Sequence, residues 1–208
     1  MEYEIRVELK KGSMAKEINL PGPKEKGSTS IEETLNKRRS VRDYKKGPLR
    51  LEQISQLLWA ASGKNLYRRT VPSAGATYSL ETYLVVGEVE GLEPGIYHYS
   101  YSSHSLERTK DQDVRNKLSQ AALGQRMIEK ASIDIIIAAD YGRTTSHYGQ
   151  RGIRYVHMEV GHMGQNISLQ ANALSLGVVM IGAFDDQEAK EVLGIKEEPL
   201  YIIPVGKI

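Results

Sequence analysis

The chain has 208 residues, of which 28 are basic and 26 acidic, so its net charge is only +2. This length suits one α/β domain with a sizeable core, and the balanced charge gives no reason to expect a nucleic acid or an anionic membrane as partner. The absence of cysteine excludes disulfides, thiolate metal sites, iron–sulfur clusters and cysteine nucleophiles. Because no apolar signal segment or stretch of ~20 apolar residues is present, we expect a soluble, cytoplasmic protein.

The N-terminal part of the sequence reads as an extension. Residues 3–9 alternate apolar and charged side chains, which is typical of a half-buried strand at a sheet edge. Residues 11–13 and 21–27 are rich in turn-forming glycine, proline and serine. We therefore divide the chain into an N-terminal extension, residues 1–30, and one domain, residues 31–208.

A short helix follows, because Ser30 and Glu33 match the capping box that opens helices. The predicted helix directs Ile31 and Leu35 inward. After Gly47 and Pro48, apolar residues at three- and four-residue spacing predict a second helix that ends at Gly63.

The most basic stretch lies where the first helix ends. It reads Lys37-Arg38-Arg39-Ser40-Val41-Arg42-Asp43-Tyr44. Three guanidinium groups and one hydroxyl within five residues suit a doubly charged phosphate better than a single carboxylate. We interpret the stretch as an anion-binding site made by Arg38, Arg39, Ser40 and Arg42, although a basic run at a helix end can also be a solvated surface.

A loop of small residues, Pro72-Ser73-Ala74-Gly75, precedes a strand at residues 82–86. Small side chains allow a ligand to approach the backbone closely, while an ordinary turn before a strand has the same composition. A tyrosine-rich strand at 96–101, a continuous β-branched run at 133–139 and a last strand at 200–205 complete the sheet. The pattern predicts an α+β fold with a mixed, mainly antiparallel sheet flanked by helices.

The longest helix is predicted from Gly152 to Leu176, ended by Gly177. It would span ~37 Å, more than one small core needs, and the small residues Gly161 and Gly164 would let another helix pack closely. We therefore expect a homodimer with this helix in its interface. His157 and His162 are five residues apart, which does not suit one metal ion, so no metal site is predicted.

The segment before this helix contains the candidates for chemistry. Its polar residues 144–146 lack apolar periodicity, as expected of a mobile lid loop. His147 can exchange a proton near neutral pH and Tyr148 can position substrate or supply its hydroxyl, so both are candidate catalytic residues. We expect Arg151 and Arg154 to contact substrate, with purely structural roles for all four as the alternative.

Taken in order, four blocks of this chain resemble the FMN-dependent nitroreductase family, and most closely its SagB-type dehydrogenase branch. They are Arg38–Tyr44, Pro72–Ala76, Tyr148–Tyr155 and Ile181–Asp185. The resemblance covers about residues 31–206 and implies a homodimer with FMN at the subunit interface. It implies that Arg38, Ser40 and Arg42 contact the phosphate and ribityl chain, that Pro72, Ser73, Ala74 and Gly75 lie along the isoalloxazine, and that Gly182 and Ala183 face flavin N5.

Two departures from the family pattern bear on function. Many members carry a basic residue beyond the last strand that also meets the phosphate, whereas this chain stops two residues after Gly206, which leaves Lys207 as the substitute. The azoline-oxidising relatives have a Lys-Tyr pair where this chain has His147 and Tyr148.

The resemblance favours an oxidoreductase that transfers hydride through FMN, with NAD(P)H as transient donor and a small electrophile such as a nitroaromatic or quinone as acceptor. A second hypothesis is an FMN-dependent dehydrogenase that oxidises an azoline or another heterocycle in peptide maturation. A third is a flavin- or nucleic-acid-binding module without catalysis, for which the basic stretch would be the binding surface.

Overall fold

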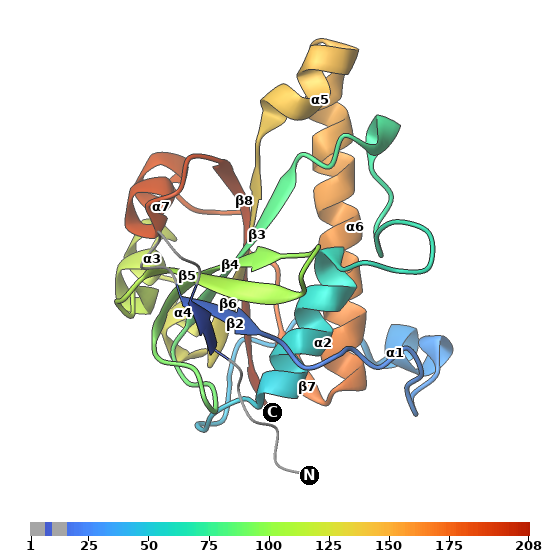
Figure 1. The fold of residues 1–208 in the computed structure, drawn as a ribbon. Coiled ribbons are helices and arrows are strands. Elements are labelled where there is room, and N and C mark those ends of the chain that lie inside the picture. The colour runs from blue at the N-terminus through green and yellow to red at the C-terminus, as the bar shows by residue number, and fades with distance from the viewer. Residues whose placement is uncertain (1–6, 10–15) are drawn as a thin grey trace.

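An eight-stranded sheet runs through the middle of the molecule (Figure 1). The computed structural model describes residues 7–9 and 16–208, so most of the strand predicted over residues 3–9 and the turn at 11–13 lie outside the described residues. The strand order is β1-β2-β5-β4-β3-β6-β8-β7. The strands are β1 (Val7–Leu9), β2 (Lys16–Asn19), β3 (Leu80–Val86), β4 (Gly95–Ser100), β5 (Ser105–Lys110), β6 (Ile133–Ala139), β7 (Leu176–Val178) and β8 (Glu198–Lys207).

The strands of this sheet pair in antiparallel fashion throughout. Within residues 7–9 and 16–208, the one parallel pairing is an isolated bridge between Leu49 and Val89. The α+β class and the mainly antiparallel sheet are therefore confirmed. The tyrosine-rich strand β4 pairs in antiparallel fashion with the preceding strand β3, with Tyr83 facing His98.

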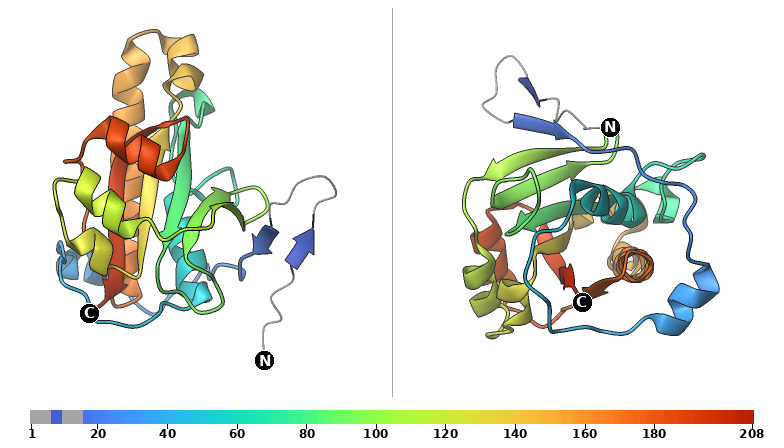
Figure 2. Two further views of the ribbon diagram at one scale, coloured as in Figure 1. Left: turned by 90° about the vertical axis from the view of Figure 1, so that its left-hand side faces the viewer. Right: turned by 90° about the horizontal axis from the view of Figure 1, so that it is seen from below.

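Helices cover both faces of the sheet (Figure 1, Figure 2). The helices α2 and α6 pack on one face, and α3, α4 and α7 pack on the other. No helix in the described part of the chain is both long and apolar enough to cross a lipid bilayer. The helices are α1 (Ile31–Lys37), α2 (Leu51–Ser62), α3 (Arg115–Ala121), α4 (Met127–Lys130), α5 (Tyr141–Tyr148), α6 (Arg151–Ala173) and α7 (Asp186–Leu193), with a 3-10 turn, η1 (Ala74–Ala76).

The central strand β6 shows why the sequence there is apolar at every position but Asp134. Ile135 and Ile137 point toward α2 and α6, whereas Ile136 and Ala138 point toward the other helical layer. Every residue of β6 is buried. A strand covered on both faces needs apolar side chains at successive positions, which explains the continuous β-branched run.

The start of α1 was predicted correctly, but the buried face of this helix was not. The Ser30 hydroxyl accepts a hydrogen bond from the Glu33 backbone N–H at 3.1 Å, as the capping box requires. Ile31 and Leu35, however, are 54% and 53% exposed, and Thr34 is the buried residue. The helix has seven residues and lies outside the sheet, so only a narrow side of it meets the protein.

The long helix α6 ends earlier than its apolar pattern suggested. It stops at Ala173, and Ser175 takes a positive φ of 57° in the turn that follows. Gly177 lies in β7 and does not end the helix. A Cβ on Gly177 would stand 2.7 Å from Val41 Cγ1 and 2.5 Å from Ile208 Cγ2, so glycine is needed there for close packing.

Asp134 of β6 is an exception inside this core. Its side chain is fully buried, and neither carboxylate oxygen has a hydrogen-bond partner among the described residues. Burial raises the pKa of Asp134 well above its usual range, and the nearby Arg115 opposes this only in part. Asp113 lies just before α3, and its pKa is shifted the other way. Burial alone would raise the pKa of Asp113, but the hydrogen bonds and charge of Arg115 outweigh burial and lower it.

These two aspartates should give stability profiles of opposite sign. The raised pKa of Asp134 means that its stabilising proton is lost as pH rises, so Asp134→Asn should gain stability over wild type above about pH 4. The gain should grow by about 1.4 kcal/mol per pH unit up to the raised pKa, because only the aspartate must bind a proton in order to fold. Asp113→Asn should instead be less stable than wild type at neutral pH and approach it as pH falls. Urea unfolding between about pH 2 and pH 8 measures both, because the Asp113 contribution is lost only below the ordinary carboxyl pKa of about 4. Parallel profiles would contradict the assignment.

Candidate active site

The basic stretch after α1 lies along the edge of the sheet. The Val41 backbone N–H donates to the Val178 carbonyl of β7 and the Lys45 N–H donates to the Lys207 carbonyl of β8, both at 2.9 Å. A Cβ on Gly206 would lie 2.7 Å from the Tyr44 ring, so the absence of a side chain there lets the ring pack on β8. The segment is thereby fixed in place by contacts with both strands.

This segment forms a hollow of about 590 Å³, which we call the arginine hollow. Within the described residues, Arg38, Arg39 and Arg42 have no ion pair, and Asp43 is exposed with only a 4.0 Å contact to Lys130. An uncompensated cluster of guanidinium groups favours binding of an external anion. The lining residues are Arg39, Ser40, Val41, Arg42, Asp43, Tyr44, Lys45 and Ile208.

Two predicted phosphate contacts lie outside this lining. Arg38 caps the C-terminal end of α1 and is partly buried. The backbone carbonyl of Lys207 accepts a hydrogen bond from the Lys45 N–H. The ammonium group of Lys207 lies beside Gly47. The structure thus brings Arg39, Ser40 and Arg42 together, and the roles of Arg38 and Lys207 stay predictions.

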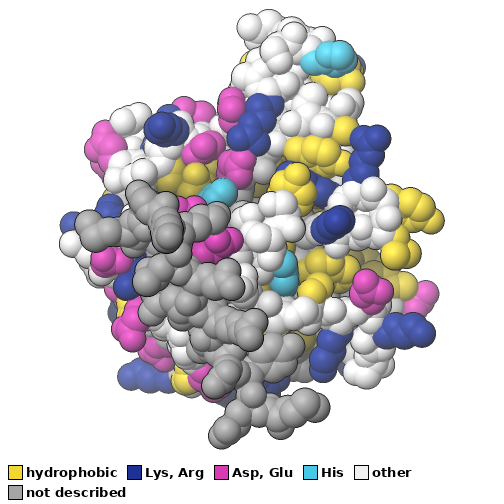
Figure 3. Space-filling model, in the orientation of Figure 1, with side chains coloured by type: hydrophobic (Ala, Val, Ile, Leu, Met, Phe, Trp, Pro, Cys, Tyr) yellow, Lys and Arg dark blue, Asp and Glu magenta, His cyan; other side chains and the backbone are white. Residues whose placement is uncertain are grey.

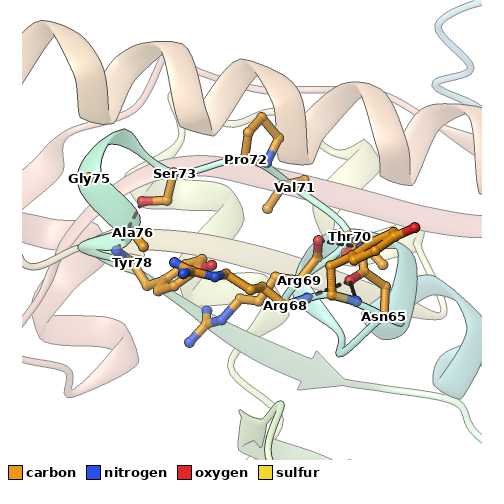
Figure 4. A pocket seen from close by; sticks show the side chains of 11 residues that line it. Asn65, Arg68, Arg69, Thr70, Val71, Pro72, Ser73, Gly75, Ala76 and Tyr78 are labelled. Carbon is orange, nitrogen blue, oxygen red and sulfur yellow. Dashed lines mark hydrogen bonds between the residues drawn. The ribbon is translucent and has the colours of Figure 1, made fainter.

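A second hollow of about 590 Å³ lies next to the predicted flavin loop, and we call it the loop hollow (Figure 4). Gly75, at φ 58°, and Ala76, at φ 54°, both take left-handed conformations in the tight turn η1. Ala74 belongs to this turn but does not line the hollow. The lining residues are Asn65, Tyr67, Arg68, Arg69, Thr70, Val71, Pro72, Ser73, Gly75, Ala76 and Tyr78.

A buried carboxyl group of α6 fixes this loop. The Ser73 hydroxyl donates to Glu159 Oε2 at 2.6 Å and accepts from the Tyr78 backbone N–H at 2.9 Å. Burial raises the pKa of Glu159, although the Ser73 hydrogen bond and the charge of Arg69 act against this. Sequence reasoning missed Glu159, whose signal was a charged residue beside Val160 on the buried face of α6. Ser73 therefore uses its hydroxyl to hold the loop.

Tyr148 reaches the same loop from α5. Its hydroxyl lies 2.7 Å from the position that a Cβ on Gly75 would take. Its ring makes edge contacts with Tyr155, at a centroid distance of 5.2 Å, and with His147, at 4.6 Å. The structure therefore brings Tyr148 to the predicted flavin loop, with His147 exposed beside it.

The predicted lid loop is wrong, because residues 144–146 lie within the helix α5. The Asp140 side chain caps this helix by accepting from the Gly142 N–H at 3.0 Å. The buried Thr144 hydroxyl is hydrogen-bonded to those of Thr77 and Ser79. Arg143 binds Glu81 at 2.7 Å. Polar contacts hold this helix, which is why its sequence lacks apolar periodicity.

The remaining predicted site residues line neither hollow. Arg154 is exposed on α6, and the Arg151 guanidinium lies 5.8 Å from the centre of the Tyr155 ring. Gly182 and Ala183 are exposed before α7, with the Ala183 carbonyl accepting from Gln125 at 2.8 Å. Their predicted contacts with substrate and flavin N5 stay predictions.

The segments that line the two hollows contact different parts of the molecule, and those of the loop hollow lie along the middle of α6, at Glu159 and Asn166. Glu159 of α6 binds Ser73 in the wall of the loop hollow. The segment that lines the arginine hollow, which we call the arginine segment, pairs with β7, and β7 follows soon after the helix ends at Ala173. The helix rises ~21 Å between Glu159 and Ala173. Within the described protomer, the predicted phosphate contacts and the predicted ring contacts therefore line two separate hollows.

The sequence signature of the Nitroreductase family matches residues 35–207. A Methanocaldococcus jannaschii protein named as a nitroreductase is 51% identical over 193 residues, covering 92% of this chain and 96% of its own. A nitroreductase-named structure from Ralstonia eutropha aligns with a TM-score of 0.80 and 27% identity, covering 100% of this chain and 95% of that one. The microcin B17-processing protein McbC of Escherichia coli is 27% identical, over 78% of this chain and 64% of McbC. This chain belongs to the nitroreductase family.

Proposed function

We propose that this protein is an FMN-dependent oxidoreductase that takes hydride from NAD(P)H and passes it to a small electrophile, with nitroaromatics and quinones as acceptors in vitro. The observation that carries the proposal is the arginine hollow, whose guanidinium groups have no ion pair within the described residues. When bound, FMN supplies reversible hydride acceptance at N5. The protein's part is to hold the phosphate, position substrate and control protons.

The arginine hollow fits a flavin phosphate in charge and in hydrogen-bond donors. Arg39 and Arg42 can each donate paired hydrogen bonds to phosphate oxygens, and Ser40 adds a hydroxyl between them. Lys45 lines the same hollow and adds a further positive charge. A phosphate there would lie at the sheet edge, where the contacts to β7 and β8 hold the segment.

The separation of the hollows supports a homodimer in which each flavin site takes its phosphate contacts from one protomer and its Pro72–Gly75 loop from the other. The exposed side of α6 offers a surface for such contact, with Met158 at 53% exposure and Gly161 open to solvent. Gly164, which we expected in the interface, instead packs against Tyr201 and Met180 of its own protomer. Of the two glycines expected in the interface, only Gly161 stays in the proposal.

Flavin reduction tests the proposed function directly. The purified protein is expected to carry FMN and to lose its oxidised-flavin absorbance when NADH or NADPH is added without oxygen. Admission of a nitroaromatic or quinone should restore that absorbance. A flavin-free protein that gains no FMN on incubation would contradict the proposal, and salt-sensitive DNA binding by such a protein would favour a non-catalytic module.

A second candidate function rests on the similarity to McbC. It is FMN-dependent oxidation of an azoline or another heterocycle, with oxygen reoxidising the flavin. Flavin that NADH and NADPH leave oxidised, but that an azoline-containing peptide bleaches, would favour it. The exposed His147 beside Tyr148 stands where azoline-oxidising relatives have lysine, which favours the reductase.

A further inference from the structure

A rigid turn presents two adjacent arginines at the loop hollow. The Asn65 side-chain oxygen accepts from the backbone N–H groups of Tyr67, at 2.9 Å, and Arg68, at 2.7 Å. Its amide nitrogen donates to the Arg69 carbonyl at 2.6 Å. One asparagine thus fixes the backbone of the turn, and Figure 4 shows Arg68 and Arg69 along the same side of the hollow.

Aromatic rings hold the guanidinium of Arg69. It lies 3.5 Å from the centre of the Tyr101 ring and 4.3 Å from that of Tyr78. Its buried Nε has no hydrogen-bond partner in the described part of the chain. Stacking on aromatic faces fixes a guanidinium without neutralising it, so Arg69 keeps its positive charge at the hollow.

No carboxylate of the described residues forms an ion pair with Arg68 or Arg69. Glu159 affects Arg69 electrostatically, but its Oε2 already accepts from Ser73 and burial raises its pKa. Arg68 is exposed. Two neighbouring guanidinium groups without a counter-ion favour binding of an external anion.

The position of this pair decides which anion it serves. In the proposed homodimer the arginine hollow of the other protomer holds the flavin phosphate, which leaves this pair for the anion of a different molecule. Tyr67 lines the same hollow and is 90% exposed, which leaves its ring free to stack on a planar group. Figure 3 shows basic and hydrophobic side chains side by side on the surface over the segment between α2 and β3.

We infer that Arg68 and Arg69 bind the carboxylate or phosphate group of a planar substrate whose reacting part lies over the Pro72–Tyr78 loop. The inference rests on the proposed function, since it places the substrate beside the loop that contacts the flavin. The anion could belong to the acceptor, as an aromatic carboxylate, or to the nicotinamide donor, as a phosphate. Both present the same anionic oxygens to the guanidinium groups.

Steady-state and stopped-flow kinetics of Arg68→Ala separate these sources. The acceptor pair is 4-nitrobenzoate and neutral 4-nitrobenzyl alcohol, and the donor pair is NADPH and NADH. Loss of one charge-assisted contact should raise KM for the anionic probe by about 10- to 100-fold, with kcat kept and the neutral acceptor unaffected. Arg68→Lys should recover part of the affinity. Lys117→Ala, which removes an exposed charge on α3, is the matched control.

Each outcome bears on the inference. A KM increase for 4-nitrobenzoate alone assigns the acceptor, an increase for NADPH alone assigns the donor's 2′-phosphate, and an increase for both donors assigns the pyrophosphate. Unchanged constants for every probe, or equal losses with the neutral acceptor, would overturn it. If wild type fails to turn over, the proposed function fails. Calorimetric titration of wild type and Arg68→Ala with 4-nitrobenzoate and with NADPH then still tests the subsite, and equal affinity for both probes overturns it.

Discussion

Replacing both Arg39 and Arg42 by alanine is expected to weaken FMN binding by about two to four orders of magnitude. Each guanidinium that contacts a phosphate contributes roughly 1.5–3 kcal/mol, and both line the arginine hollow without an internal counter-ion. Fluorescence titration of the apoprotein measures the loss. Lys117→Ala combined with Lys196→Ala removes the same charge from exposed positions and should keep FMN affinity. Equal affinity in both double variants would contradict the phosphate assignment.

The double variant Arg39→Ala/Arg42→Ala also tests whether two protomers share each site. A Gly75→Val chain should also lose flavin, because φ at this position is 58° and a side chain would collide with Tyr148 in its own protomer. In coexpressed mixed dimers, one site would combine the intact arginines of one chain with the intact loop of the other. With random pairing about half of the dimers are mixed, and each mixed dimer has one intact site. The mixture should therefore bind FMN at about a quarter of the wild-type number of sites. A mixture that binds no more FMN than its two parents would show that each protomer builds its own site.

Tyr148→Phe is expected to keep its FMN but to reduce acceptors about 10²- to 10⁴-fold more slowly, the usual contribution of a group that transfers a proton. The Tyr148 hydroxyl lies against Gly75 of the proposed flavin loop, which places it where a substrate would react. His147→Ala should slow the same half-reaction if the exposed imidazole supplies the proton. Stopped-flow absorbance separates flavin reduction from acceptor reduction.

Tyr155→Phe is the matched control for this experiment. Tyr155 packs edge-on against Tyr148, so its variant removes a neighbouring hydroxyl without touching Gly75. It should keep wild-type rates. Wild-type acceptor reduction in Tyr148→Phe and His147→Ala, with each acceptor, would leave both residues with structural roles only.

Local pattern was enough to predict those parts of the fold in which neighbouring residues share one environment. The continuous β-branched run of β6 and the caps Ser30 and Gly63 are examples. The inward face of α1 was wrong because a capping box fixes where a helix begins and carries no information about its buried side. The lid was wrong because the hydroxyl partners of Thr144 lie more than 60 residues away in the sequence.

The candidate site shows the same limit. Its blocks were visible locally, as an arginine cluster and a loop of small residues. The hydrogen bond between Ser73 and Glu159 joins residues 86 positions apart, so no local pattern shows it. The need for glycine at 177 and 206 likewise comes from Val41 and Tyr44, which pack there from a distant segment.

The docking of the arginine segment onto the sheet edge links cofactor supply to the survival of the protein. The backbone contacts of Val41 and Lys45 and the packing of Tyr44 on β8 hold a strongly basic segment whose charges repel one another. A bound phosphate would relieve that repulsion and stabilise the docked form in proportion to the logarithm of its concentration relative to Kd. Chains without flavin would release this segment more often and expose its arginines and lysines to proteases. The amount of folded protein in a cell would then follow its supply of flavin.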